Sequence, residues 1–75
     1  MSRLPRVTGA QVGRALERAG FVLVRVTGSH HHFHKGGVPG VVTVPVHAGE
    51  TIPPGTLSSI LRQAEMSVEE FSALL

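Results

Sequence analysis

The sequence predicts an α+β fold in the order α-β-β-β-α, and three observations support this order. Apolar residues recur at helical spacing near the N-terminus, three short segments rich in β-branched residues follow, and a second helical pattern comes after them. The chain has 75 residues, so we expect a single domain spanning 1–75 with a small core. Strands joined by short turns form an antiparallel meander, and we expect both main helices on one face of a three-stranded sheet.

The first helix is expected over residues 8–19. Thr8 and Gln11 have the spacing of a capping box, and Gly20 follows as a C-terminal stop. Its apolar face is expected to consist of Val12, Ala15, Leu16 and Ala19. Three charged residues should point away from the core: Arg14, Glu17 and Arg18.

Three strands are expected over residues 21–27, 30–35 and 41–46, and residues 36–40 form the second connecting loop. Gly28 and Ser29 make a tight turn between the first two strands. Pro45 has no amide hydrogen, so the third strand is an edge strand or ends there. Alternation along the second strand places His31, Phe33 and Lys35 on the buried face, with His31 partly covered. The solvated face then carries His30, His32 and His34.

Two helical segments complete the chain. Pro54 suits the first turn of a helix that ends near Glu65, and its apolar stripe consists of Leu57, Ile60 and Leu61. Ser67 and Glu70 form a second capping-box pattern, which begins a short terminal helix. The apolar side of this last helix is expected to contain Val68, Phe71, Leu74 and Leu75.

Composition excludes several classes of protein. There is no cysteine, so disulfides and thiolate metal sites are excluded, and no apolar run approaches the ~20 residues of a membrane span. The N-terminal residues have no apolar signal segment, so we expect a cytoplasmic protein without membrane contact. Seven Lys and Arg residues stand against five Asp and Glu, and six of the seven cations fall in the first half of the chain. This distribution is compatible with a polyanionic partner, but charge alone favours an ordinary basic surface.

The histidine-rich second strand has three interpretations. The first is a solvated strand without chemistry, the second is a metal site, and the third is a site for acid–base chemistry on nucleic acid. His30 and His32 could chelate zinc, nickel or copper, but a structural site needs four ligands, so we expect no metal and no cofactor. Histidine can accept and donate a proton near neutrality, and RNA carries its own nucleophile in the 2′-hydroxyl. A histidine that removes this proton can therefore cleave RNA without a metal.

Other residues bear on binding of RNA. Arg25 or Lys35 could contact phosphate. Arg25 has the same strand parity as Phe21 and Leu23, so alternation does not decide which face of the sheet carries it. The chain has no Tyr or Trp, which argues against a stacking platform for single strands. Recognition by backbone and shape is favoured instead, as in double-stranded-RNA-binding domains, whose element order is also α-β-β-β-α.

Three blocks of sequence, in order, resemble the HicA-type (YcfA-like) toxins, which are the mRNA interferases of HicAB toxin–antitoxin systems. The first block is Arg25-Val26-Thr27 followed by Gly28-Ser29-His30 at the start of the second strand. The second is Val-Thr-Val-Pro-Val-His over residues 42–47, and the third covers residues 52–64. The similarity extends from about residue 11 to residue 75.

The resemblance implies a double-stranded-RNA-binding-domain-like fold and a metal-independent, ribosome-independent endoribonuclease that cleaves mRNA. The family's catalytic residue is the histidine after Gly-Ser, which here is His30, with Gly28 and Ser29 supporting it in the turn. His32 and His47 are both candidates for the second proton-transfer group, and either could contact RNA instead. Lys35 and Arg25 remain candidate phosphate contacts.

The resemblance also implies a protein partner. A HicB-type antitoxin would bind over the active site, so the protein is expected as a monomer when free or in a heteromeric complex with its antitoxin. The alternative from another class is a non-catalytic RNA-binding module that uses the same face of the sheet and cleaves nothing.

Overall fold

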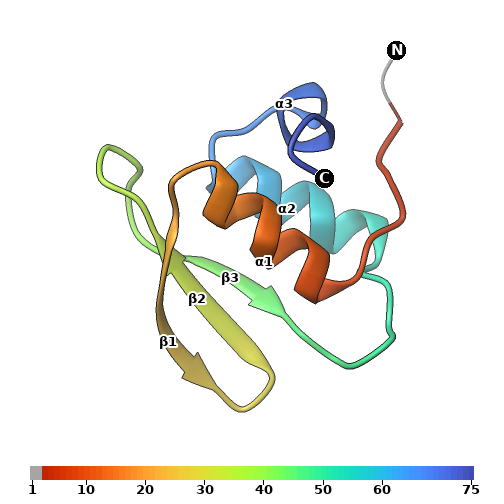
Figure 1. Ribbon diagram of the computed structural model, residues 1–75, viewed down its shortest axis with the longest axis horizontal. Helices are drawn as coiled ribbons and strands as arrows, with labels where there is room; N and C mark the ends of the chain where they lie inside the picture. Colours follow the sequence, from red (N-terminus) through yellow and green to blue (C-terminus); the bar gives the residue numbers. More distant parts are fainter. Residues whose placement is uncertain (1–2) are drawn as a thin grey trace.

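The computed structural model describes residues 3–75 and confirms the predicted element order (Figure 1). The sheet is antiparallel in the order β1-β2-β3, so β1 and β3 are its two edges. The first five elements begin and end within two residues of their expected bounds, whereas the last helix ends earlier than expected. The elements are α1 (Gly9–Arg18), β1 (Val22–Thr27), β2 (His30–His34), β3 (Val42–Pro45), α2 (Pro54–Gln63) and α3 (Val68–Ser72).

Both predicted capping boxes are present. At the start of α1, the Thr8 amide donates to Gln11 Oε1 at 2.8 Å and the Gln11 amide donates to Thr8 Oγ1 at 3.3 Å. At the start of α3, Ser67 and Glu70 exchange the same two hydrogen bonds at 2.8 and 3.0 Å. These reciprocal bonds satisfy amides that the helix itself leaves without acceptors, which fixes where each helix begins.

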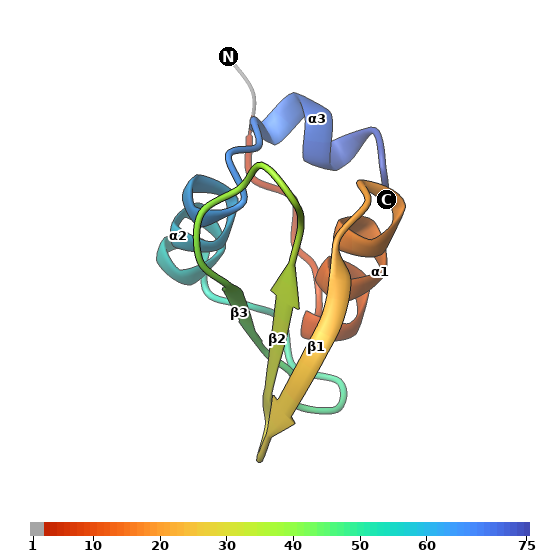
Figure 2. The same ribbon diagram turned by 90° about the vertical axis from the view of Figure 1, so that its left-hand side faces the viewer.

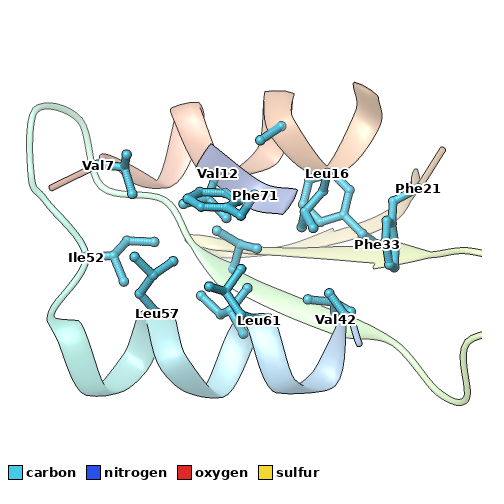
Figure 3. Close-up of a cluster of buried hydrophobic side chains, with 14 residues drawn as sticks. Val7, Val12, Leu16, Phe21, Phe33, Val42, Ile52, Leu57, Leu61 and Phe71 are labelled. Carbon is cyan, nitrogen blue, oxygen red and sulfur yellow. The ribbon is translucent and has the colours of Figure 1, made fainter. Parts of the chain in front are cut away.

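The core lies between the helices and one face of the sheet. Figure 3 shows side chains from α1 and α2 pointing toward each other, with the Phe71 ring of α3 between the two helices. All three helices supply fully buried side chains, which include Val12, Leu16, Leu57 and Phe71. The predicted apolar stripe of α2 is buried throughout, whereas Ala19 of α1 is half-buried. Leu75 was expected on the apolar side of the last helix, which is wrong: α3 ends at Ser72, and Leu75 is 48% exposed beyond it.

The two faces of the sheet differ as predicted. Residues paired directly across antiparallel strands point to the same side, and β2 lies between β1 and β3 (Figure 2). Phe33 pairs with Val42 and His31 pairs with Val44, and these residues face the helices. His31 is half-buried there, as expected. The other face, which we call the open face, carries His30 opposite Pro45 and His32 opposite Thr43.

A β-bulge decides the position of Arg25. Leu23 pairs with Phe33, but the next pair is Arg25 with His32, so Val24 is an extra residue in β1. An extra residue shifts the alternation of the strand by one position. By simple alternation Arg25 would lie on the helix side with Leu23, whereas the bulge places it on the open face beside His32. The side of Arg25, which strand parity left open, is therefore settled.

Helix α1 lies very close to the end of β3. Gly9 is buried in the first turn of α1, and a Cβ built there would meet the Pro45 carbonyl oxygen at 2.2 Å. Gly13, one turn later, faces the Phe33 ring, which a Cβ would approach to 3.1 Å. At Gly9 only glycine permits this separation, whereas a Cβ at Gly13 would require the Phe33 ring to shift by a few tenths of an ångström. Gly9 therefore sets how closely the start of α1 approaches the sheet.

Candidate active site

His30 is the first residue of β2 and follows the tight turn of Gly28 and Ser29. Gly28 has φ +58°, a backbone conformation that glycine adopts without steric cost. The Ser29 carbonyl accepts a 2.7 Å hydrogen bond from the Val46 amide, which ties the turn to the chain just after β3. The His30 side chain is exposed and has no hydrogen bond or ion pair with any residue between 3 and 75. Both ring nitrogens are therefore available to a bound molecule.

His32 is held in place by two threonines. Its Nε2 lies 2.6 Å from Thr27 Oγ1 on β1, and its Nδ1 lies 2.9 Å from Thr43 Oγ1 on β3. The imidazole thus connects all three strands across the open face, and it is half-buried. Both of its ring nitrogens already have partners, in contrast to those of His30.

The two candidate phosphate contacts lie on different sides of the sheet. Arg25 is exposed and pairs with His32, so it belongs to the open face. Lys35 follows β2, and its Nζ lies 5.7 Å from the centroid of the Phe21 ring. This cation–π contact keeps the amine on the helix side. Lys35 therefore lies away from His30, and its predicted grouping with the site is not supported by its position.

His34 occupies the far end of the same strand. Its Nδ1 lies 3.2 Å from the Gly40 carbonyl oxygen of the β2–β3 loop. Close to that end of the sheet, several valines are exposed: Val22 at 61%, Val24 at 54% and Val41 at 49%. The open face thus has a polar end around His30 and an apolar end around His34.

His47 lies beyond the end of β3 and lines a pocket of about 320 Å³. The pocket is bounded by the end of β3, the following loop and the start of α2, and its lining consists of Pro45, His47, Glu50, Thr51, Ile52, Pro53 and Thr56. Pro45 is also the residue paired with His30, so the pocket adjoins the catalytic candidate. Of these residues, His47 is a candidate from the sequence, whereas Glu50, Thr51 and Thr56 are not. No periodic pattern marks them, because they are brought together by a loop and a helix end.

Between residues 3 and 75, no three His, Cys, Asp or Glu side chains are grouped so that they could hold a metal ion. His32, one of the two suggested chelating residues, has both ring nitrogens bonded to threonines. No helix within the same range is long and apolar enough to cross a membrane.

The fold and the site together define a class of protein. An open antiparallel sheet with helices on one face, in the order α-β-β-β-α, is the arrangement of double-stranded-RNA-binding domains, and here histidines line its open face. Residues 9–66 match the family described as HicA toxin of bacterial toxin–antitoxin. The chain therefore belongs to the HicA toxin family and is the toxin of a toxin–antitoxin system, which implies a cognate antitoxin. No curated protein matches the chain.

Proposed function

We propose that this toxin is an endoribonuclease that cleaves mRNA without a metal, with His30 as the general base. The observation that supports this most directly is the state of His30, exposed on the open face and unpartnered within residues 3–75. A general base must come within hydrogen-bond reach of the proton it takes, and a His30 ring without partners can do so with either nitrogen. Family membership supports the same role, because His30 follows Gly28 and Ser29 in the family motif. Since the substrate is mRNA, we place the protein's action in the cytoplasm.

The reaction needs two proton transfers. A ring nitrogen of neutral His30 takes the proton of a ribose 2′-hydroxyl, and the 2′-oxygen attacks the adjacent phosphorus. The bond from phosphorus to the 5′-oxygen of the next nucleotide breaks, and that oxygen takes a proton from a general acid. The products are a 2′,3′-cyclic phosphate and a 5′-hydroxyl, so atoms and charge balance.

His47 suits the role of general acid better than His32. The His47 side chain is exposed and has no hydrogen bond or ion pair with any described residue between 3 and 75. It lines the pocket together with Pro45, which is paired with His30. His32 would first have to give up a threonine hydroxyl. We assign His32 to orienting the RNA on the open face.

Arg25 supplies positive charge to the same face. Arg25 pairs with His32 and so belongs to the open face, along which we propose that the RNA backbone runs. A guanidinium can bind a phosphate through two parallel hydrogen bonds, which positions the strand and stabilises the charge that develops on phosphate oxygens. The bulge at Val24 is thus part of the site.

The cognate antitoxin is proposed to be of the HicB type and to cover the open face. The exposed valines Val22, Val24 and Val41 favour a protein partner at the end away from His30, because clustered apolar side chains lose contact with water on binding. We expect the free toxin to be a monomer, and the complex to block access to His30.

The test compares two histidine variants. Purified wild-type protein, His30→Ala and His34→Ala are each incubated with a long mRNA, with and without EDTA. Wild type and His34→Ala should cleave equally with EDTA present, and His30→Ala should lose cleavage by about 100-fold or more, the usual contribution of a general base. His34 is the matched control because it lies on the same strand and face but is bonded to the Gly40 carbonyl.

Cleavage by folded His30→Ala at the wild-type rate would contradict the assignment. Loss of cleavage with EDTA would indicate a metal-dependent enzyme. RNA binding without cleavage by the wild type would indicate the non-catalytic RNA-binding module instead. Circular dichroism of each variant establishes that the substitution leaves the fold intact.

A further inference from the structure

We propose that the pocket lined by His47 and Glu50 binds the nucleobase next to the scissile phosphate and selects bases with an amino group over uracil. This inference deepens the proposed function and rests on it for the identity of the polymer as RNA. It concerns which RNA is cut, a property that the position of His30 alone does not determine.

The pocket lies directly beside the proposed general base. Pro45 is paired with His30 across β2 and β3, and the same Pro45 forms part of the pocket lining. The Val46 amide is bonded to the Ser29 carbonyl at 2.7 Å, so the pocket wall and the turn before His30 are held together. A nucleotide whose 2′-hydroxyl meets His30 therefore has its base, or the neighbouring base, within reach of the pocket.

The pocket is formed before any ligand binds. The Glu50 amide donates to the His47 carbonyl at 3.0 Å, closing a turn in which Gly49 has φ +74°. That turn joins His47 and Glu50, both of which line the pocket. The Ile52 amide donates to the Val7 carbonyl at 2.8 Å, which anchors this lining residue to the segment before α1. A preformed site of this kind loses little entropy when it binds a base.

The lining matches a nucleobase better than a phosphate. Pro45, Ile52 and Pro53 offer apolar surface to the plane of a base, and Thr51 and Thr56 offer hydroxyls at its edge. The volume of about 320 Å³ is at the lower end for small-ligand sites and suits a single base. Glu50 repels phosphate. Arg6 lies in a neighbouring hollow, which shares Thr51, Ile52 and Pro53 with this pocket and could receive the next phosphate.

Glu50 gives the pocket its selectivity. An ionised carboxylate only accepts hydrogen bonds. Adenine, cytosine and guanine each present an exocyclic amino group that can donate to it. Uracil has no amino group, and its single edge donor, N3–H, is flanked by two carbonyl oxygens that the carboxylate repels. A good side-chain contact to a base edge discriminates by roughly 5- to 150-fold. We therefore expect uracil to be disfavoured by a factor in this range.

The experiment measures base preference by binding and by cleavage. The non-cleaving His30→Ala protein is titrated with fluorescent hexamers of A, C and U, and wild-type cleavage sites are mapped on an RNA of random sequence. The A and C hexamers should bind at least fivefold more tightly than U, and uracil should be depleted at one position beside the cut. In the Glu50→Ala background the binding ratio should approach one. Glu17→Ala, which removes the same charge from the exposed side of α1, should keep the ratio.

Each outcome is decisive. Equal binding of the three hexamers, no binding of any of them, or an unchanged ratio in Glu50→Ala overturns the base pocket. If wild-type protein cuts RNA without any base preference, the base pocket alone fails. If the binding ratio holds while wild-type protein cuts nothing, the proposed nuclease activity fails and the base pocket remains.

Discussion

Replacement of Gly9 by alanine tests how closely α1 must approach the sheet. A Cβ at this position would lie 2.2 Å from the Pro45 carbonyl oxygen, so that oxygen must retreat by about 0.8 Å to reach 3.0 Å, the shortest distance real Cβ atoms show. Val46 Cα would also be too close, at 2.9 Å. Both neighbours are backbone atoms, so no side-chain rotation relieves the clash. The helix or the end of β3 has to move.

Two opposing effects set the magnitude. Alanine in place of glycine within a helix stabilises the fold by roughly 0.5–1 kcal/mol, because it reduces the freedom of the unfolded chain. Overpacking against a rigid neighbour costs about 1–3 kcal/mol, occasionally more. A backbone clash belongs at the upper end, so we expect Gly9→Ala to lower the free energy of unfolding by about 2 kcal/mol. For a domain of this size that lowers Tm by about 8–16 °C.

Thermal unfolding followed by circular dichroism measures this effect. Gly55→Ala is the matched control, because Gly55 also lies in the first turn of a helix but a Cβ there meets nothing within 4 Å. Its Tm should stay the same or rise by a few degrees. Pro45 pairs with His30, so a shift of Pro45 should also disturb the site. Gly9→Ala should therefore lose more RNA cleavage than its unfolded fraction accounts for. If Gly9→Ala melts at the wild-type temperature, the close approach of α1 is refuted.

Two further predictions concern charge. Arg25→Ala in the non-cleaving His30→Ala protein should weaken RNA binding. It should also make the slope of log K against log salt less steep by about 1, the value for one phosphate contact. Arg14→Ala, on the helix side, should change neither. Equal slopes, measured by fluorescence anisotropy at several salt concentrations, would contradict the placement of Arg25. The hydrogen bond from the Ser67 amide lowers the pKa of the Glu70 carboxyl below its ordinary value of 4.5. A lowered pKa stabilises the fold fully above pH 4.5, and this contribution is lost as the pH falls through the lowered value. Between pH 5 and pH 2, the Tm of Glu70→Gln should therefore fall by less than the Tm of the wild type. Identical curves of Tm against pH for the two proteins would disprove this.

Much of the fold followed from local sequence. The Thr8 and Ser67 caps were predicted from residues three apart, and both form as expected. The separation of His30 from Phe33 onto opposite faces followed from strand alternation, and the register confirms it. Such features depend on backbone geometry within a few residues, which is why sequence alone reveals them.

The positions of the charged side chains were harder to predict. Alternation left the side of Arg25 undecided, because a bulge in β1 depends on how that strand pairs with β2. Lys35 was grouped with the site from its sequence position, but contact with Phe21 keeps it elsewhere. Both outcomes depend on partners from another strand or loop.

Local patterns along the chain are enough to predict the element order, the caps, the faces of the second strand and the motif that contains His30. Three features appear only once the chain has folded: Thr27 and Thr43 hold His32, Arg25 joins the open face, and Glu50 lines a pocket next to His30. The difference lies in the range of the interactions. Periodicity and capping act over three or four residues, whereas the site is assembled from three strands, a loop and a helix end, which meet only when the chain has folded.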